Sequence, residues 1–466
     1  MYTENVCIVL LFIFKHNRKM NNESDIDPWK QMHDCKGKCI ELSREVAKKS
    51  IDYNGPKVYV QFASFLDPQL IPTIHDMLEK ADNPEALTFG ICWQYGDDED
   101  PNTFDGIHTF RVYKAHYSES TGLGWARHIT NALWAGEEFT LQLDSHHRFA
   151  LHWDTMLMED FKQAQEMGFK KPVITTYTPQ YCPYEPMPPM NSVSGQPLPF
   201  EPTLMAPYEF STERLLMSRV SYLPNWRALN RVVRTRTLSA HFIFTDGVFC
   251  REVNYDPECF YGGYLEEQNL SARAWTNGYD FFSPHRVYLV HDYSRKYRAK
   301  IWEKRDTSAL DMIAHRRLWQ LLGQDDLGIN LGPYGLGTLR TLEQYQKFIG
   351  IDFKDCKITN ETLSLQEPGT AVVDVNVTIK LDLEKIKDDC SKQHSELRYI
   401  TVGFETGSGE VLHRSDMSAG AYPDVFAFKQ DSIIMSFRSH TQPDKYVMWT
   451  LFEDGSWGSR QEGTCV

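Results

Sequence analysis

The alternation of apolar and polar positions predicts a strand, a helix and a second strand near the start of the chain. Residues 57–63 and 87–93 form two apolar runs of strand length. Between them, apolar side chains recur at the spacing of a buried helix face: Leu70, Ile71, Ile74, Met77, Leu78 and Ala81. Asp67-Pro68 supplies a helix N-cap and a proline for the first helical position. This order is the opening of a βαβ nucleotide-binding unit.

The next two hundred residues continue the mixture of helices and strands. Helices are expected at residues 124–135, 154–167 and 309–322, and strands at residues 139–143 and 241–245. The strand of residues 139–143 stops at Asp144. We therefore expect an α/β fold, with a Rossmann-like mixed sheet flanked by helices.

The last hundred residues change character. Apolar side chains alternate there at period two, namely Val373, Val375, Val377, Ile379 and Leu381. Further strands are expected at residues 397–404, 425–428, 432–437 and 446–452. This pattern predicts a separate all-β, sandwich-like module that carries no chemistry of its own.

Length and composition set the domain boundaries. A chain of 466 residues is about three times the usual domain size. We expect a flexible, irregular arm at residues 1–54, an α/β domain at residues 55–352 and the β module at residues 360–466. Nine of the 23 prolines fall within residues 178–207, so we expect a loop without regular structure there. This loop is either a linker or a lid that borders the acceptor groove.

Charge and hydropathy exclude several classes of function. The net charge of −14 repels nucleic acid and anionic lipid. The mean hydropathy of −0.46 is too low for a protein with several membrane spans. Ten scattered cysteines favour a reducing compartment, although Cys35 and Cys39 with His33 form a possible half zinc site.

One apolar run lies near the N-terminus, at residues 6–14. It is too short for a membrane span, which needs about 20 residues. It has the length of a signal-peptide core, but basic residues do not precede it; Lys15, Arg18 and Lys19 follow it instead. We therefore expect a cytoplasmic protein without a membrane span, with secretion as the alternative.

Asp144-Ser145-His146 is the first candidate for chemistry. Side chains at positions i and i+2 of an extended chain point to the same side, so Asp144 and His146 can face one ion. One carboxylate and one imidazole suit a borderline cation such as Mn²⁺ better than Ca²⁺. The alternative is a polar pair that merely ends the strand.

A second candidate segment lies between residues 255 and 291. Gly262 and Gly263 allow a close approach of the backbone to a ligand, and Glu266 offers a carboxylate to sugar hydroxyls. His291 follows an apolar run and is available as a further metal ligand. Each has a structural alternative: the glycines form a turn, and His291 caps an element.

Together these motifs resemble two related families. Asp144-Ser145-His146, Tyr255-Asp256-Pro257 and Ser271-x-Arg273-x-Trp275 are similar to motifs of the retaining polypeptide N-acetylgalactosaminyltransferases. A finer pattern resembles the cytoplasmic hydroxyproline N-acetylglucosaminyltransferases, which modify the S-phase-kinase-associated adaptor subunit of SCF ubiquitin ligases. It comprises Val60-Gln61-x-Ala63-Ser64-x-x-Asp67-Pro68, Gly90-Ile91-Cys92-Trp93-Gln94, Ala126-Arg127-His128 and the stretch from Leu141 to Asp154.

The resemblance implies a GT-A glycosyltransferase fold, a UDP-GlcNAc donor, a divalent cation such as Mn²⁺ and transfer to a protein acceptor with retention of configuration. It implies that Asp144, His146 and His291 bind the metal and that Glu266 acts with Asp144 in catalysis beside the transferred sugar. The donor site would comprise Ala63, Ser64, Arg127, Gly262, Gly263 and Glu266.

Two alternative functions remain open at this stage. One is a Golgi enzyme that acts on Thr or Ser, and another is an inactive transferase-like binding module. The sequon at Asn269 favours the cytoplasm, because a glycan there would obstruct the proposed sugar site. Without an obvious second carboxylate partner for Glu266, front-face displacement is favoured over double displacement, which the sequence does not exclude.

Overall fold

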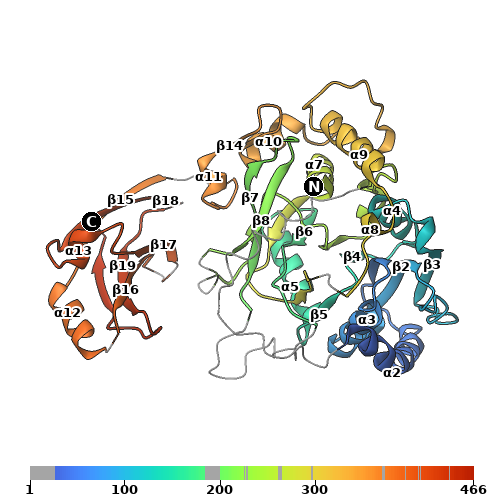
Figure 1. Ribbon diagram of the computed structural model, residues 1–466, viewed down its shortest axis with the longest axis horizontal. Coiled ribbons are helices and arrows are strands. Elements are labelled where there is room, and N and C mark those ends of the chain that lie inside the picture. The colour runs from blue at the N-terminus through green and yellow to red at the C-terminus, as the bar shows by residue number, and fades with distance from the viewer. Residues whose placement is uncertain are drawn as a thin grey trace.

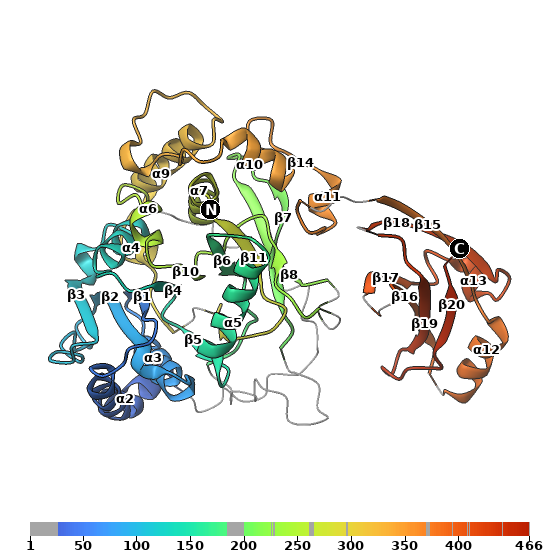
Figure 2. The same ribbon diagram turned by 180° about the vertical axis from the view of Figure 1, so that it is seen from behind.

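The computed structural model describes residues 27–465 except 184–199, 225, 227–228, 261–264, 295–296, 370–372, 394, 408, 410 and 440. Two bodies lie side by side (Figures 1 and 2). We call them the large lobe, which holds α2 to α11, and the C-terminal β module, which holds β15 to β20. No helix in the described residues is long and apolar enough to cross a bilayer.

An eight-stranded mixed sheet forms the centre of the large lobe, in the order β3-β2-β1-β4-β10-β6-β11-β9. Its strands are β1 (Val58–Phe65), β2 (Leu87–Tyr95), β3 (Phe110–His116), β4 (Phe139–Leu143), β6 (Pro172–Thr175), β9 (Val233–Arg234), β10 (Phe242–Asp246) and β11 (Asp280–Ser283). The first four strands are parallel to one another, whereas β10 runs antiparallel to both of its neighbours. The strand–helix–strand start predicted from the sequence is confirmed as β1, α3 and β2.

Helices cover both faces of this sheet. They are α2 (Pro28–Ser50), α3 (Leu70–Lys80), α4 (Leu123–Ala132), α5 (Trp153–Glu166), α6 (Phe249–Glu252), α7 (Leu265–Thr276), α8 (Ile301–Lys304), α9 (Ser308–Leu321), α10 (Leu342–Ile349) and α11 (Asn360–Leu363). Neighbouring strand residues divide between two cores: Ile174 packs with α2, α3 and α5, whereas Val173 packs with α7, α9 and α10. Alternate side chains of these strands therefore point into two different helical layers, one on each face of the sheet.

The expected irregular arm is wrong for residues 28–50, which form helix α2. Asp27 caps this helix through the backbone of Trp29, and Pro28 occupies its first turn. Few apolar residues mark it, but Met32, Cys39 and Val46 lie on one buried face that packs against α3. Tertiary packing therefore stabilises a helix that the polar composition conceals. The apolar run of residues 6–14 lies outside the described residues.

Regular structure also occurs within the proline-rich stretch of residues 178–207. Strand β7 (Thr203–Phe210) pairs with β8 (Leu216–Tyr222) as an antiparallel hairpin, so the expectation of an irregular loop is wrong for its last five residues. The strand accommodates Pro207 beside a shift in register between residues 207 and 209. Residues 184–199 lie outside the described part of the chain.

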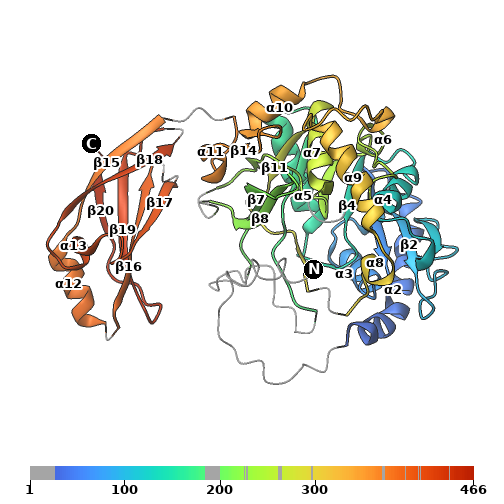
Figure 3. The same ribbon diagram turned by 45° about the horizontal axis from the view of Figure 1, so that its top comes forward.

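The C-terminal β module has its own core, as the period-two pattern predicted. Its elements are β15 (Val373–Lys380), α12 (Leu383–Lys392), β16 (Leu397–Glu405), β17 (Val411–Met417), α13 (Pro423–Phe426), β18 (Ser432–Ser439), β19 (Lys445–Phe452) and β20 (Gln461–Thr464). A two-stranded sheet, β15-β18, faces a four-stranded sheet, β17-β16-β19-β20 (Figure 3). The strand expected at residues 425–428 is wrong, because Pro423 begins a short helix there.

Short elements complete the large lobe. They are η1 (Pro84–Ala86), η2 (Tyr117–Glu119), β5 (His147–Phe149), β12 (Leu289–His291), η4 (Gly332–Tyr334), β13 (Ile351–Asp352) and β14 (Lys357–Ile358). The pair β5-β12 is a small antiparallel sheet, and it places His291 opposite His147. The mixed α/β lobe confirms the fold class expected from the sequence. The module is built on two β-sheets, as expected, but it also contains the helices α12 and α13.

Candidate active site and metal centre

The site lies where β1 and β4 end together. These parallel strands are neighbours, with Phe62 opposite Leu143, and the strand order reverses there because β2 lies on the other side of β1. Ligands of open α/β sheets bind at such a switch point, outside the carboxyl ends of the strands. The chain places Ala63 and Ser64 at the end of β1 and Asp144 immediately after β4.

Asp144 presents one carboxylate oxygen to each of two sides. Its Oδ1 accepts a hydrogen bond of 2.8 Å from Arg127 Nη2, and Arg127 also donates to the carbonyl of Leu143. Burial alone would raise the pKa of Asp144, but the hydrogen bond with His291 and the charge of Arg127 hold it well below its ordinary value. Asp144 is therefore an anion at neutral pH, with Oδ2 turned toward His291 and His146.

His146 is fixed in orientation by a buried carboxylate. Asp67 Oδ2 lies 2.7 Å from His146 Nδ1 and also accepts a hydrogen bond from Ser145. This leaves His146 Nε2 facing Asp144 Oδ2 at 3.8 Å. Burial opposes ionisation of Asp67, yet Arg298 and His146 lower the pKa of its carboxyl to about 2. The expected N-cap at Asp67 is wrong, because α3 begins at Leu70 and Gln69 is its N-cap. The carboxylate of Asp67 instead accepts from the backbone N–H of Gln69 and holds the imidazole of His146.

His291 completes the cluster from a distant part of the chain. Pairing of β12 with β5 brings its Nε2 to 3.4 Å from Asp144 Oδ2, and its ring centre lies 4.6 Å from that of His146. Burial, reinforced by the charge of His146, lowers the pKa of His291 well below its ordinary value. A neutral imidazole has the free lone pair that a metal ligand requires.

These three residues fit a divalent cation. One ligand atom from each of Asp144, His146 and His291 lies within 4.8 Å of the others. Among the described residues, no other group of three or more His, Cys, Asp or Glu side chains has this arrangement. The carboxylate behind His146 is the usual support of a metal-bound imidazole. The structure thus brings together the three residues that the sequence proposed, although their role as ligands remains a prediction.

Two further histidines, His147 and His241, lie beside the cluster, and the sequence reasoning missed both. The rings of His147 and His241 lie 4.8 and 4.6 Å from that of His291. His147 Nδ1 lies 2.9 Å from the carbonyl of Asp144, so this side chain supports the turn that carries the carboxylate. The adjacent position of His147 was a signal for it, whereas His241 had none beyond its place at the start of β10.

Glu266 lies in the first turn of α7 and is buried. Its Oε1 accepts a hydrogen bond of 2.7 Å from the hydroxyl of Tyr255, which itself accepts one from Gln142. Burial raises the pKa of Glu266 to about 7. The sequence expected a carboxylate free to bind sugar hydroxyls, and the structure shows one that is already oriented by a tyrosine.

Glu267 is a second acidic residue of the site that the sequence reasoning missed. Tyr177 OH lies 3.4 Å from its Oε1, and its buried Oε2 has no hydrogen-bond partner among the described residues. Burial, together with the charge of Glu266, raises the pKa of Glu267 to about 8. A protonated carboxyl at this position donates a hydrogen bond, whereas an ionised one accepts only.

The proposed donor residues divide into three groups. Ser64 is buried at the end of β1 and its hydroxyl has no hydrogen-bond partner among the described residues, while Ala63 is partly exposed beside it. Arg127 binds Asp144. Gly262 and Gly263 lie outside the described residues. The donor-binding role of these five residues, and of Glu266, stays a prediction.

Comparisons with known proteins gave one family and several distant structural matches. No curated protein matches the sequence. Solved structures with similar folds include GalNAc-T7 with UDP, GalNAc and Mn²⁺ (12% identity, 89% of this chain, 73% of that chain, TM-score 0.42). Another is TarS of S. aureus in complex with UDP-GlcNAc (13% identity, 58% of this chain, 68% of that chain, TM-score 0.37). A third is the mannosyltransferase PcManGT of Pyrobaculum calidifontis with GDP-Man and Mn²⁺ (11% identity, 58% of this chain, 69% of that chain, TM-score 0.32).

The family model described as "Glycosyltransferase (GlcNAc)" matches residues 57–109 and 106–355. The match runs from the first strand of the central sheet to β13 and includes Asp144, His146, Glu266 and His291. It therefore covers the whole site and well over half of the chain. The large lobe has a mixed α/β fold, and the chain belongs to the GlcNAc glycosyltransferase family.

Proposed function

We propose that this chain transfers N-acetylglucosamine from UDP-GlcNAc to a hydroxyproline of a cytoplasmic protein, an SCF adaptor subunit, with retention of configuration. The observation that carries the proposal is the convergence of Asp144, His146 and His291 at the carboxyl ends of β1 and β4. Family membership supports the reaction class, and the motifs shared with the hydroxyproline enzymes support the acceptor.

The leaving group of this reaction is a nucleoside diphosphate, whose negative charge increases as the bond breaks. A divalent cation, which we propose to be Mn²⁺, supplies electrostatic stabilisation of that charge when bound. Asp144, His146 and His291 would hold it. Arg127 and Asp67 keep two of these ligands in place, and Arg298 Nη2 lies 3.3 Å from His146 Nε2, the nitrogen that would bind the cation.

Glu266 and Glu267 would contact the transferred sugar. Tyr255 fixes one carboxylate oxygen of Glu266, which leaves its other oxygen for the sugar. Glu267, with a raised pKa, would donate a hydrogen bond from its protonated carboxyl. The two carboxyls are adjacent on one turn of α7 rather than on opposite sides of a sugar ring, which supports front-face displacement over a covalent intermediate.

A cytoplasmic location is part of the proposal. Asn269, the sequon asparagine within α7, is 3% exposed, and its side-chain oxygen accepts a hydrogen bond from Arg273. A glycan attached there during lumenal synthesis would prevent α7 from packing. The sequon is therefore compatible with the fold when the chain is not glycosylated.

The test is a donor-hydrolysis panel with each UDP-sugar, with and without Mn²⁺. It is followed by transfer to matched peptides that carry hydroxyproline, proline or threonine at one position. We expect hydrolysis of UDP-GlcNAc that requires the metal, and transfer to hydroxyproline alone. Transfer to threonine would identify a Golgi-type activity instead, and a lack of hydrolysis of every donor would identify an inactive binding module.

A further inference from the structure

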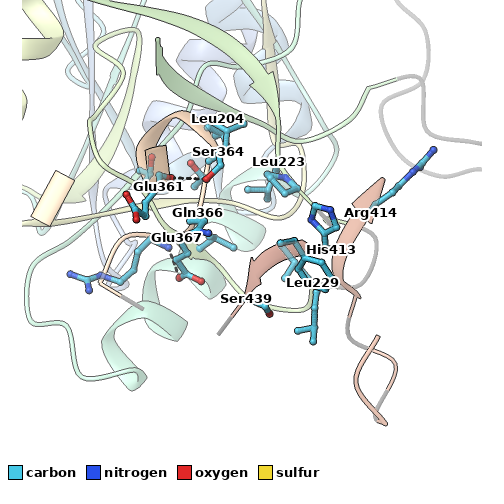
Figure 4. A pocket seen from close by; sticks show the side chains of 18 of the residues that line it. Leu204, Leu223, Leu229, Glu361, Ser364, Gln366, Glu367, His413, Arg414 and Ser439 are labelled. Carbon is cyan, nitrogen blue, oxygen red and sulfur yellow. Dashed lines mark hydrogen bonds between the residues drawn. The ribbon is translucent and has the colours of Figure 1, made fainter. Parts of the chain in front are cut away.

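A cavity of about 870 Å³ lies where the large lobe meets the C-terminal β module. Leu204, Leu223 and Leu229 of the large lobe line it together with His413 and Arg414 of the module. Figure 4 shows His413 beside Leu223, whereas the side chain of Arg414 points away from these leucines. A volume of this size suits a drug-sized ligand or a short peptide segment. No part of the proposed metal centre lines this cavity.

Most of the charged groups in the cavity wall neutralise one another. Arg231 forms a two-pronged ion pair with Glu367, with N–O distances of 3.0 and 2.8 Å. Arg234 lies 3.3 Å from Asp280, which is outside the wall, and Arg414 pairs with Asp416 at 3.2 Å. A neighbouring carboxylate therefore offsets the positive charge of each of these arginines.

Arg236 differs from them. It is 8% exposed, and its hydrogen bonds go only to neutral oxygens: Ile349 O and Thr362 Oγ1, both at 3.1 Å, and Glu361 O at 3.4 Å. Its Nη1 makes no hydrogen bond within the described residues, and no described carboxylate forms an ion pair with it. Burial lowers its pKa to about 10, so the side chain keeps its charge at neutral pH. A buried charge without a counter-ion is costly, which makes this guanidinium a candidate for binding an anion.

Strand β7 lies between the cavity and the active site in the hydrogen-bond network. Leu204, Met205 and Pro207 of this strand line the cavity. Thr203, at its start, donates a hydrogen bond to the carbonyl of Tyr177, whose hydroxyl bonds to Glu267. Two hydrogen bonds therefore connect the start of β7 to a residue of the proposed sugar site.

We propose that this cavity binds an acidic peptide segment of the acceptor protein, with a carboxylate on Arg236 and apolar side chains against Leu204, Leu223 and Leu229. The fork of an arginine matches a carboxylate, and the leucines provide the apolar surface that a free small anion does not need. The whole chain carries a net charge of −14 and repels an acidic partner elsewhere. A buried arginine without a counter-ion therefore favours binding of an acidic partner at this cavity. The proposal rests on the proposed function, since it takes the acceptor to be a protein.

The experiment measures binding of a fluorescein-labelled peptide of alternating Leu and Glu to the full chain by anisotropy, without donor or metal. A peptide with Gln in place of Glu is the neutral probe. We expect the acidic peptide to bind and Arg236→Met to weaken it about tenfold or more, while UDP-GlcNAc hydrolysis stays within about twofold of the native rate. Arg398→Met, which removes the same charge from an exposed position outside the cavity, should leave both unchanged.

A second variant tests the same point without removing the arginine. Ser364 is exposed on the cavity wall, and its hydroxyl donates to Glu361 O, the carbonyl that also accepts from Arg236 (Figure 4). Ser364→Glu therefore places a carboxylate beside the guanidinium and should block the acidic peptide, whereas Ser364→Ala should not. This pair decides the question even if Arg236→Met fails to fold.

Several outcomes would overturn the proposal. One is equal binding of the Glu and Gln peptides, and another is native-like binding by the folded Arg236→Met and Ser364→Glu variants; a lower melting temperature as the only effect would show that Arg236 merely caps the end of α10. Displacement of the acidic peptide by low inorganic phosphate would indicate a site for small anions. Failure of the transferase assay leaves this binding result unaffected, so the two proposals are judged separately.

Discussion

At the residue scale, the two oxygens of Asp144 have separate partners. Oδ1 is held by Arg127, and Oδ2 faces His146 and His291. Asp144→Asn keeps an oxygen for Arg127 but removes the negative charge. We expect metal binding to weaken more than about 100-fold and turnover to fall about as far. Calorimetric titration with Mn²⁺ and a UDP-GlcNAc hydrolysis assay measure the two effects.

The matched control is Asp105→Asn, which removes an exposed carboxylate paired with Lys114. It should change neither metal binding nor turnover. The fold of Asp144→Asn should persist, with a loss of about 1–3 kcal/mol in the free energy of unfolding, because a charged hydrogen bond becomes a neutral one. Metal-dependent turnover at the native rate in Asp144→Asn would contradict the assignment of this residue.

Asp67 acts through His146, and its effect depends on pH. Its folded pKa lies below the unfolded value, so it stabilises the native state above about pH 4, and this contribution is lost as the pH falls toward 2. For the native chain we expect about 2 kcal/mol of acid-dependent destabilisation that Asp67→Asn lacks. Urea unfolding of both proteins from about pH 5 downward measures the difference; parallel pH profiles would show that the carboxylate is not held as an anion.

The same variant separates positioning from folding. If Asp67 orients His146, Asp67→Asn should weaken Mn²⁺ binding about 10- to 100-fold even at neutral pH, where the native fold is retained. An unchanged affinity for Mn²⁺ would mean that His146 holds its orientation without this carboxylate.

Glu266 and Glu267 affect the pH dependence of stability in the opposite direction to Asp67. Their folded pKa values lie above the unfolded ones, so the native state binds more protons and stability falls as the pH rises from about 5 to about 8. Glu267→Gln, which mimics the protonated form, should flatten this decline. Melting temperature across that range is the measurement, with Glu79→Gln on the exposed side of α3 as the control. A native-like decline in Glu267→Gln would show that Glu267 does not titrate there.

At the element scale, local periodicity predicted the strands and helices that build the sheet. The boundaries of β1, β4 and α5 fall within two residues of those expected, because burial of one face leaves a regular pattern in the sequence. The pattern failed for α2, where few apolar residues mark a long amphipathic helix, and for residues 425–428, where a proline begins a helical turn.

The candidate site shows the same division between local and distant information. Asp144 and His146 share one face of a short segment, so spacing alone linked them. Pairing of β12 with β5 brings in His291, which is 147 positions from Asp144. No periodicity encodes such a contact. The position of His291 after an apolar run made it a candidate, and the family resemblance linked it to Asp144 and His146. Asp67 lay within a quoted motif, but its bond to His146 follows from the packing of α3 beside β5.

The proline-rich stretch is an element whose two ends can be placed. Thr176 and Thr203 exchange contacts with one another and with Tyr177, so both ends return to the rim that holds Glu267. We expect deletion of residues 187–195 to raise the KM for a protein acceptor about tenfold and to leave donor hydrolysis unchanged. An unchanged acceptor KM would show that the stretch is only a spacer, and steady-state kinetics with the intact acceptor distinguish the two.

At the scale of the whole molecule, the core of the β module is separate from those of the large lobe. Its buried residues all lie between Val375 and Met448, and none belongs to either of the other two clusters. The large lobe, however, needs the residues that follow the family match: Thr362 binds Arg236, and Glu367 binds Arg231. A truncated chain should therefore end at Gly369 rather than near Asp352.

We expect the chain truncated at Gly369 to fold and to hydrolyse UDP-GlcNAc at a rate within about twofold of the native one, because each core remains complete. Its KM for a protein acceptor should rise, since the module wall that carries His413 and Arg414 is lost from the cavity. A short hydroxyproline peptide, which reaches only the site beside Glu266, should be used equally by both chains. Loss of donor hydrolysis in a truncated chain that still melts cooperatively would show that the module contributes to the chemistry itself.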